Sequence, residues 1–172
     1  MYKRQLHLSG KCLDCGAGIG RVTKHLLSRI FDTVDLLEVN QLFLQHAKQV
    51  NLKDLDIGAY HCASLHEFHF TSFYDCIWIQ WVSSQLYNED YVLFLQRCQQ
   101  ALLPKGVIII KENILRSEEE EDVAMDYEDY SFTRTDKGFK ALFAKAKLQV
   151  IQQGLQTHWP MDLFPVKMYA LQ

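Results

Sequence analysis

The sequence predicts an α/β protein built on a doubly wound, mostly parallel sheet of seven strands, with an antiparallel hairpin at the C-terminal end. Three observations lead to this fold class. Short apolar runs alternate with amphipathic helical segments, as they do in parallel sheets that carry helices on both faces. A turn with glycines at alternate positions, Gly16 to Gly20, separates the first run from the first helix. Two apolar runs without a helix between them end the chain.

The first half of the chain alternates regularly between the two kinds of segment. In the first helix, Val22, Leu26 and Ile30 recur at helical spacing, and Asn40 is placed to cap the second helix. The predicted elements are a strand from about Lys11, a helix over 21–30, a strand over 33–39, a helix over 41–50 and a strand over 57–62.

The second half begins with the most apolar and aromatic run, 73–82, which predicts a central parallel strand. Asn88 and the acids after it predict the start of a helix. Residues 114–133 break the alternation with an acidic run over 117–122. The other predicted elements are a helix over 88–102, a turn over 103–106, a strand over 107–110, a helix from Thr135 or Asp136, and closing strands over 148–155 and 166–171.

Length, charge and cysteine content limit the class of protein. A chain of 172 residues can bury a core of its own, and we expect residues 1–172 to form a single domain. A formal net charge of −3 argues against direct nucleic-acid binding through a broad basic face. The first ten residues hold no apolar signal core, and no apolar run approaches the ~20 residues of a membrane span. We therefore expect a protein of the cytoplasm or nucleus that has no membrane partner.

The five cysteines are an odd number and favour free thiols in a reducing compartment. Cys62, Cys76 and Cys98 lie in apolar runs, so we expect them to be buried. The Cys12-x-x-Cys15 pair has no second pair to complete a metal site and is expected to be structural. The two histidines of His66-x-x-His69 are expected on a surface loop. No metal is predicted.

The ends of the predicted parallel strands indicate where a ligand binds. Ligands of such sheets lie at the carboxyl ends of the strands, and the residues expected there are Gly16, Glu38, Leu65, Gln80 and Asn113. Glycines permit positive φ and let a ligand approach bare backbone. A carboxylate about 20 residues further on is placed to accept the hydroxyls of a ribose. The alternative for Glu38 is a solvated acid at a strand end.

Two nucleoside cofactors fit this arrangement. Nicotinamide dinucleotides normally use G-x-G-x-x-G, whereas this chain has G-x-G-x-G, and the closing hairpin is common in methyltransferases. Both features favour S-adenosyl-L-methionine, and an NAD-dependent oxidoreductase is the weaker alternative. Arg21 could pair with the cofactor's carboxylate, or it could be an ordinary exposed arginine.

Three segments, 14–21, 74–82 and 106–113, resemble the signature segments of the protein alpha-N-terminal methyltransferases. The Trp-Ile-Gln-Trp sequence within 74–82 is much more specific than the glycine turn. The resemblance runs from about Lys11 to the C-terminus and implies a class I, Rossmann-like methyltransferase fold. It implies methyl transfer from S-adenosyl-L-methionine, with S-adenosyl-L-homocysteine as product, to the free α-amine of proteins that begin Xaa-Pro-Lys or Xaa-Pro-Arg. Such proteins would be the partners of this chain.

The resemblance also implies which residues bind the cofactor. Glu38 stands where most members have aspartate, and His66 where most have glutamine; both side chains keep the hydrogen-bonding capacity that is needed. The implied cofactor contacts are Gly16, Gly18, Arg21, Glu38, Val39, Asn40, Leu65, His66 and Gln80.

On the substrate side, the resemblance points to Trp81, Asn113, Asp126 and Asp129. Since an α-amine has a pKa of about 7.7 to 8.0, the main catalytic task is to orient it and to accept its proton. We expect Asn113 to position the amine, Asp129 to take the proton and Trp81 to pack on the substrate proline. Asp126 and its acidic neighbours would attract the lysine or arginine at the third position. An acidic run such as this is otherwise a solvated loop.

Two departures from the family pattern support an alternative. Gln85 stands where a histidine is the suggested proton acceptor, and glutamine cannot act as a base. The family's N-terminal helical segment has no counterpart ahead of Lys11, so we expect it to be lacking. The alternative is a catalytically weak or inactive interaction protein that binds S-adenosyl-L-methionine.

Overall fold

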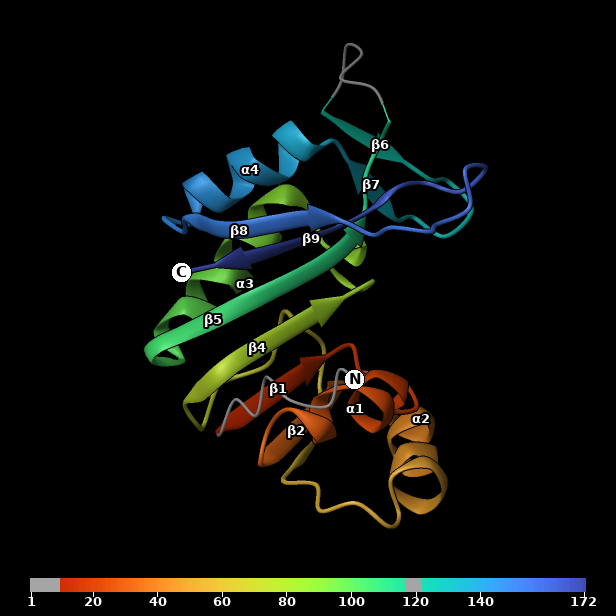
Figure 1. Cartoon of the computed structure of the whole chain (residues 1–172), viewed down its shortest axis with the longest axis vertical. Coiled ribbons are helices and arrows are strands. Elements are labelled where there is room, and N and C mark those ends of the chain that lie inside the picture. The colour runs from red at the N-terminus through yellow and green to blue at the C-terminus, as the bar shows by residue number, and fades with distance from the viewer. Residues whose placement is uncertain (1–9, 117–121) are drawn as a thin grey trace. The chain divides into compact units, whose positions relative to one another are not determined.

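A computed structural model describes residues 10–116 and 122–172 (Figure 1). The strands form a mostly parallel seven-stranded sheet in the order β3-β2-β1-β4-β5-β9-β8, together with a separate two-stranded sheet of β6 and β7. The predicted fold class is confirmed. The chain forms two compact units: residues up to Trp78 with Leu102–Gly106, and Ile79–Ala101 with Val107–Gln172. The expectation of one domain over residues 1–172 stays a prediction.

The first unit contains the start of the parallel sheet. β1 (Lys11–Cys15) pairs with β2 (Thr33–Glu38), and β2 pairs with β3 (Tyr60–Cys62), both in parallel. β4 (Tyr74–Gln80) begins in this unit. The helices are α1 (Arg21–His25) and α2 (Gln41–His46), followed by a 3₁₀ turn over Leu27–Arg29 and a π turn over Ala47–Asn51 respectively. Each helix is therefore shorter than its apolar periodicity predicts. The Asn40 side chain accepts from the N–H of Leu42 at 2.9 Å, which confirms the predicted cap.

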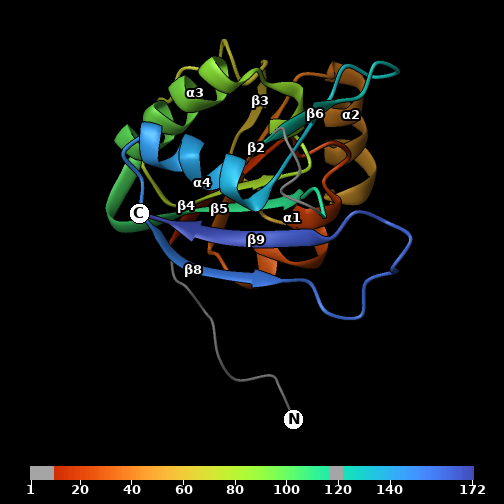
Figure 2. The same cartoon turned by 90° about the horizontal axis from the view of Figure 1, so that it is seen from above.

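The second unit contains the antiparallel end of the sheet. β9 (Val166–Leu171) pairs antiparallel with both β5 (Leu102–Asn113) and β8 (Val150–Leu155), as predicted for the closing hairpin. α3 (Asn88–Gln100) and α4 (Asp136–Lys145) pack together on one side of β9 (Figure 2). The Tyr169 ring lies 5.8 Å from that of Phe139 and 5.2 Å from that of Phe143. These aromatic contacts fix α4 on the hairpin.

Several predicted boundaries are wrong. β5 starts at Leu102, so 103–106 is not a separate turn, although Lys105 has a left-handed φ of 70° within the strand. β4 stops at Gln80 because Trp81 has a φ of 52°, which ends the extended backbone. Residues 114–133, expected to be irregular, contain β6 (Val123–Met125) and the first two residues of β7 (Phe132–Arg134), which pair antiparallel. Three-residue strands are too short to produce a recognisable apolar period.

All five cysteines are free. Cys12, Cys15, Cys76 and Cys98 are buried, whereas the expectation of burial is wrong for Cys62, which is exposed. It ends the three-residue strand β3, which is last in the strand order of the sheet. Burial, with a hydrogen bond to Cys76, raises the pKa of the Cys12 thiol.

Within residues 10–116 and 122–172, no helix is long and apolar enough to cross a membrane. In the same residues, no three His, Cys, Asp or Glu side chains are grouped to hold a metal ion.

Candidate functional site

The glycine turn of the first unit places bare backbone beside open space. Gly16, Gly18 and Gly20 have φ values of 67°, 56° and 79°, a region that side chains other than glycine rarely adopt. The Gly16 N–H donates to the carbonyl oxygen of Leu37 at 2.8 Å, which ties the turn to β2. Apart from Gly18 and its two chain neighbours, none of residues 10–116 and 122–172 has a heavy atom within 4 Å of the position that a Cβ on Gly18 would take. A ligand can therefore reach the backbone at Gly18.

Glu38 connects the glycine turn to the start of α2. Its Oε2 accepts from the N–H of Gly18 at 2.9 Å, and its Oε1 accepts from the N–H of Asn40 at 2.8 Å. The side chain is 9% exposed. A carboxylate oxygen can accept a second hydrogen bond, so both oxygens retain capacity for hydroxyl donors. Val39, between Glu38 and Asn40 in the sequence, is 65% exposed and offers apolar surface beside the carboxylate.

The other predicted cofactor residues differ in how far they are exposed. Arg21 and His66 are exposed, and Leu65 is buried. His69 is exposed as well, as expected for a surface loop. Gln80 belongs to the second unit, where it is half-buried.

Asp14, which the sequence reasoning missed as a site residue, lies at the base of the glycine turn. Its Oδ2 accepts from Thr23 Oγ1 at 2.6 Å, which joins the end of β1 to α1, and both side chains are buried. Burial raises the pKa of Asp14 from 3.8 to about 6, against the lowering effect of the Thr23 hydrogen bond. Its position one residue before Cys15, within the motif itself, was the available signal.

The Asp14→Asn variant is expected to change how stability depends on pH. Because the folded-state pKa is raised, the stabilising contribution of Asp14 is present below about pH 4 and is lost as the pH rises through about 6. The rise in the pKa of Asp14 from 3.8 to about 6 corresponds to about 3 kcal/mol of stability, and asparagine keeps an oxygen acceptor for Thr23. Urea unfolding at pH 4, 5, 6 and 7 should show a smaller fall for Asp14→Asn than for wild type. Asp54→Asn, at an exposed position, should follow wild type, and equal slopes for all three proteins would contradict the expectation.

In the second unit, a cavity of about 350 Å³ gathers the predicted substrate residues. Three of them, Trp81, Asn113 and Asp129, line it, and so does Gln85. The other lining residues are Ser84, Glu112, Ser131, Phe132, Thr133 and Trp159. A wall of aromatic rings with an amide and a carboxylate suits an amine attached to an apolar group.

Several contacts hold Trp81 in this cavity. The backbone N–H of Trp81 donates to the carbonyl oxygen of Lys111 at 3.2 Å, and its indole Nε1–H donates to Asn113 Oδ1 at 3.2 Å. The Lys111 ammonium lies 5.4 Å from the ring centroid, and burial lowers its pKa. Trp81 is 44% exposed, so its ring is available to a ligand, whereas Trp78 in the preceding strand is 8% exposed.

A buried carboxylate supports the floor of the cavity. Glu112 Oε1 accepts from the N–H groups of Val82 and Ser83, each at 3.0 Å, and from Ser83 Oγ at 2.7 Å. Burial raises the pKa of Glu112, while the Ser83 hydrogen bonds and the charge of Arg134 act in the opposite direction. Glu112 therefore fixes the chain directly after Trp81.

Arg134 is a fully buried arginine on β7. Its guanidinium donates to Asn88 Oδ1 at 2.9 Å and to the carbonyl oxygens of Leu86 at 2.6 Å and Ser83 at 3.4 Å. It also lies 5.4 to 5.9 Å from the ring centroids of Tyr91, Phe132 and Phe139. The sequence offers no pattern for such a residue, because buried arginines are rare and 114–133 lacked a predicted element.

The two predicted aspartates lie on the turn between β6 and β7. Asp129 Oδ1 accepts from the N–H of Ser131 at 2.9 Å, and Asp126 Oδ1 accepts from the N–H of Glu128 at 2.8 Å. Hydrogen bonding to Ser131 lowers the pKa of Asp129, which is exposed and is ionised at neutral pH. Asp126 is exposed on this turn and is not among the residues that line the cavity. Most of the acidic run, residues 117–121, lies outside the described residues.

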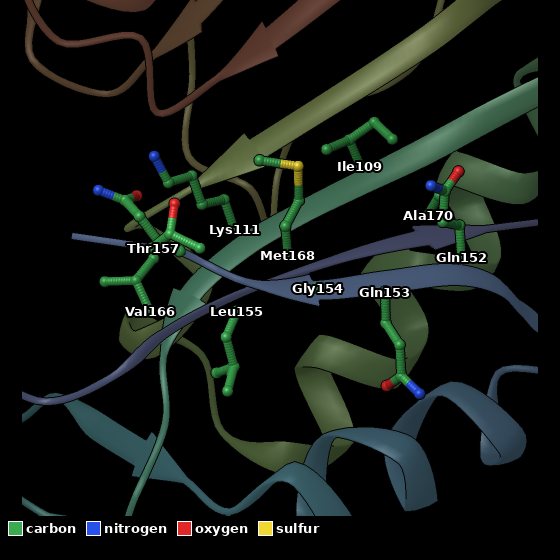
Figure 3. A pocket seen from close by; sticks show the side chains of 11 residues that line it. Ile109, Lys111, Gln152, Gln153, Gly154, Leu155, Thr157, Val166, Met168 and Ala170 are labelled. Carbon is green, nitrogen blue, oxygen red and sulfur yellow. The ribbon is translucent and has the colours of Figure 1, made fainter. Parts of the chain in front are cut away.

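A larger cavity, of about 450 Å³, lies elsewhere in the second unit, over β5, β9 and β8. Ile109, Lys111 and Met168 project from the same side of β5 and β9, whereas Leu155 and Gln153 point to the opposite side (Figure 3). Its lining includes none of the predicted substrate residues, and its walls carry no carboxylate. The smaller cavity has the chemistry of a site for an amine.

Comparison with known proteins agrees with these observations. A family model described as AdoMet dependent proline di-methyltransferase matches residues 2–172. Alpha N-terminal protein methyltransferase 1 of Dictyostelium discoideum is 44% identical over 162 residues, which cover 93% of this chain and 58% of that protein. N-terminal Xaa-Pro-Lys N-methyltransferase 1-B of Xenopus laevis is 40% identical over 161 residues, 92% of this chain and 70% of that protein.

The structure also resembles solved methyltransferases. A SAM-dependent methyltransferase of Leishmania major superposes with a TM-score of 0.89 at 40% identity, covering all of this chain and 67% of that one. The glycopeptide N-methyltransferase MtfA, with a TM-score of 0.77 at 13% identity, shows the fold alone. The chain thus spans about three fifths of the Dictyostelium relative and two thirds of the Leishmania structure. On the match over residues 2–172, the chain belongs to the AdoMet dependent proline di-methyltransferase family.

Proposed function

We propose that this chain transfers a methyl group from S-adenosyl-L-methionine to the free α-amine of proteins that begin Xaa-Pro-Lys or Xaa-Pro-Arg. The observation that supports this most strongly is the cavity that gathers Trp81, Asn113 and Asp129. Relatives named N-terminal Xaa-Pro-Lys N-methyltransferases, 39–40% identical, support the substrate class.

The first unit supplies residues suited to the cofactor. The Glu38 carboxylate, held by the N–H groups of Gly18 and Asn40, has lone pairs left for two ribose hydroxyls. Val39 offers apolar surface for an adenine ring, and the exposed guanidinium of Arg21 suits the carboxylate of the methionine part. When bound, the cofactor supplies an activated methyl group on a sulfonium.

The second unit supplies residues suited to the amine. Trp81 holds the Asn113 amide through Oδ1, whose second lone pair can accept an N–H of the amine and so orient the nitrogen lone pair. The Asp129 carboxylate is ionised, because hydrogen bonding to Ser131 lowers its pKa, and it attracts the α-ammonium group. We assign Asp129 as the acceptor through which the proton of the amine passes to solvent. With its proton removed, the amine held by Asn113 would present its nitrogen lone pair to the methyl group that the cofactor would supply. Gln85 lines the same cavity but cannot take a proton.

Mass spectrometry of a synthetic peptide that begins Ala-Pro-Lys tests this function. Incubation with the protein and S-adenosyl-L-methionine should add mass in steps of one methyl group at the N-terminal residue. The same peptide with an acetylated N-terminus should gain none, because its lysine is present but its α-amine is blocked. Methylation of both peptides, or of neither while S-adenosyl-L-homocysteine binds in calorimetry, would overturn the proposal.

The Asp129→Asn variant is expected to lower kcat about tenfold near pH 7, because the carboxylate that we assign as proton acceptor is lost while water can still take the proton. Glu128→Gln, on the same exposed turn, is the matched control and should keep the wild-type rate. The deficit of Asp129→Asn should shrink as the pH rises above 8, where the amine is already neutral. A deficit that is constant between pH 6.5 and 9 would argue against a role in proton transfer.

Two further proposals concern the setting of this activity. The five free thiols support a reducing compartment, the cytoplasm or nucleus, as the place where this chain meets its substrates. The net charge of −3 supports protein substrates without direct nucleic-acid binding.

A further inference from the structure

Trp159, in the connection between β8 and β9, forms a wall of the candidate substrate cavity. It lines this cavity together with Trp81, Asn113 and Asp129. Its ring centroid lies 6.3 Å from that of Trp81, with an angle of 38° between the ring planes. This separation is within the range of an aromatic pair and leaves no room for a third ring between the two indoles. The two side chains therefore make one continuous aromatic surface.

The connection between β8 and β9 fixes the position of Trp159. Its Nε1–H donates to the carbonyl oxygen of Phe164 at 2.9 Å, a hydrogen bond across the connection itself. His158, directly before it, has a left-handed φ of 56°, which sharply redirects the chain at this point. Because the indole N–H is already used, Trp159 has only apolar ring surface to offer a ligand.

The chemistry of the cavity indicates which part of a peptide meets this surface. Asp129 and Asn113 provide the polar atoms that suit an amine, and Lys111 places a cation on the ring of Trp81, which disfavours a second cation there. An apolar group next to the amine is therefore the best match. Proline in an extended segment commonly packs on aromatic surfaces, and its rigid ring loses little conformational entropy on binding.

We propose that Trp159 is a specificity-determining residue that contacts the substrate: with Trp81, it forms the surface on which the proline ring at the second position packs. This inference rests on the proposed function. It adds Trp159 to the residues that recognise the peptide, and it assigns the preference for proline to two rings rather than one.

Calorimetry with two peptides tests the contact directly. The peptides begin Ala-Pro-Lys and Ala-Ala-Lys, and each is titrated in the presence of saturating S-adenosyl-L-homocysteine. Trp159→Ala should weaken binding of the proline peptide about tenfold and leave the already weaker alanine peptide unchanged. Trp159→Phe, which keeps a ring but lacks the N–H, should stay within about twofold of wild type on both. Met161→Ala, at an 88% exposed position of the same connection, is the matched control and should not differ from wild type.

The possible outcomes separate this inference from the proposed function. Absence of peptide binding by the wild-type protein would overturn the proposed function and the inference with it. Equal losses on both peptides, or none, in Trp159→Ala would overturn only the inference. A Trp159→Phe variant as weak as Trp159→Ala would assign the effect to the hydrogen bond with Phe164, which would also overturn the ring contact. The predicted loss confined to the proline peptide would support it.

Discussion

Replacing Arg134 with methionine is expected to lower the free energy of unfolding by about 3 to 5 kcal/mol. The guanidinium is 1% exposed, and methionine cannot donate to the three oxygens that it serves. The acceptors left without this donor would be Asn88 Oδ1 and the carbonyl oxygens of Ser83 and Leu86. An acceptor that loses its buried donor costs about 1 to 3 kcal/mol. Glu112 would also lose the nearby positive charge that opposes its protonation.

Urea unfolding followed by circular dichroism measures this loss. Arg29→Met, at an exposed position, is the control of the same residue change and should differ from wild type by less than about 0.5 kcal/mol. Arg134→Lys should recover only part of the stability, because an ammonium group cannot reach three acceptors as a planar fork does. A loss below 1 kcal/mol in Arg134→Met would show that the surrounding aromatic rings, rather than the hydrogen bonds, hold β7 in place.

Replacing Glu38 with alanine is expected to weaken binding of S-adenosyl-L-homocysteine by at least about 100-fold. Two charge-assisted acceptors for the ribose would be lost, each worth about 1.5 to 3 kcal/mol. The N–H groups of Gly18 and Asn40 would also lose the acceptor that holds the glycine turn against α2. Calorimetry gives the affinity, and Asp54→Ala, an exposed acid of the same unit, should bind as wild type does.

A cofactor analogue separates these two roles of Glu38. If the carboxylate binds the ribose, wild type should bind 2′-deoxy S-adenosyl-L-homocysteine more weakly than the parent compound. Glu38→Ala should bind the two compounds with equal affinity. If Glu38 acts only by holding the turn, the variant should lose the same factor for both compounds. That second result would leave the ribose without an assigned partner in this chain.

The fold could be predicted because most strands of the main sheet are long enough to show a recognisable pattern of apolar residues. Runs such as Tyr74–Gln80 and Val166–Leu171 carry five or more apolar or alternating positions, enough to define a period. β6 and β7 have three residues each, so side-chain pattern gives no signal for them. Their position depends on Arg134. The free-energy cost of burying its charge is offset by hydrogen bonds to residues about 50 positions away in the sequence.

The candidate site was predictable where a short motif supplies it. Trp81 follows the strand β4 and Asn113 is the last residue of the strand β5, and a hydrogen bond joins their side chains. Trp159 could not be predicted as a site residue, because it lies in a connection without periodicity. Its ring lines the cavity at a point where the left-handed backbone of His158 redirects the chain. Asp14 and Glu112 were missed for a related reason: they serve the site by holding backbone N–H groups or a neighbouring hydroxyl, a role that residue type alone does not show.

The distribution of tryptophans makes the protein suitable for optical measurement of its own ligand binding. The chain has three: Trp81 and Trp159 share the wall of one cavity, and Trp78 is buried in the core. Indole emission depends on the polarity around the ring, so a peptide that displaces water from the cavity would change two of the three emitters. Trp78 would contribute a constant background. Peptide occupancy can therefore be followed by fluorescence in the unlabelled protein, without attaching a dye near the site.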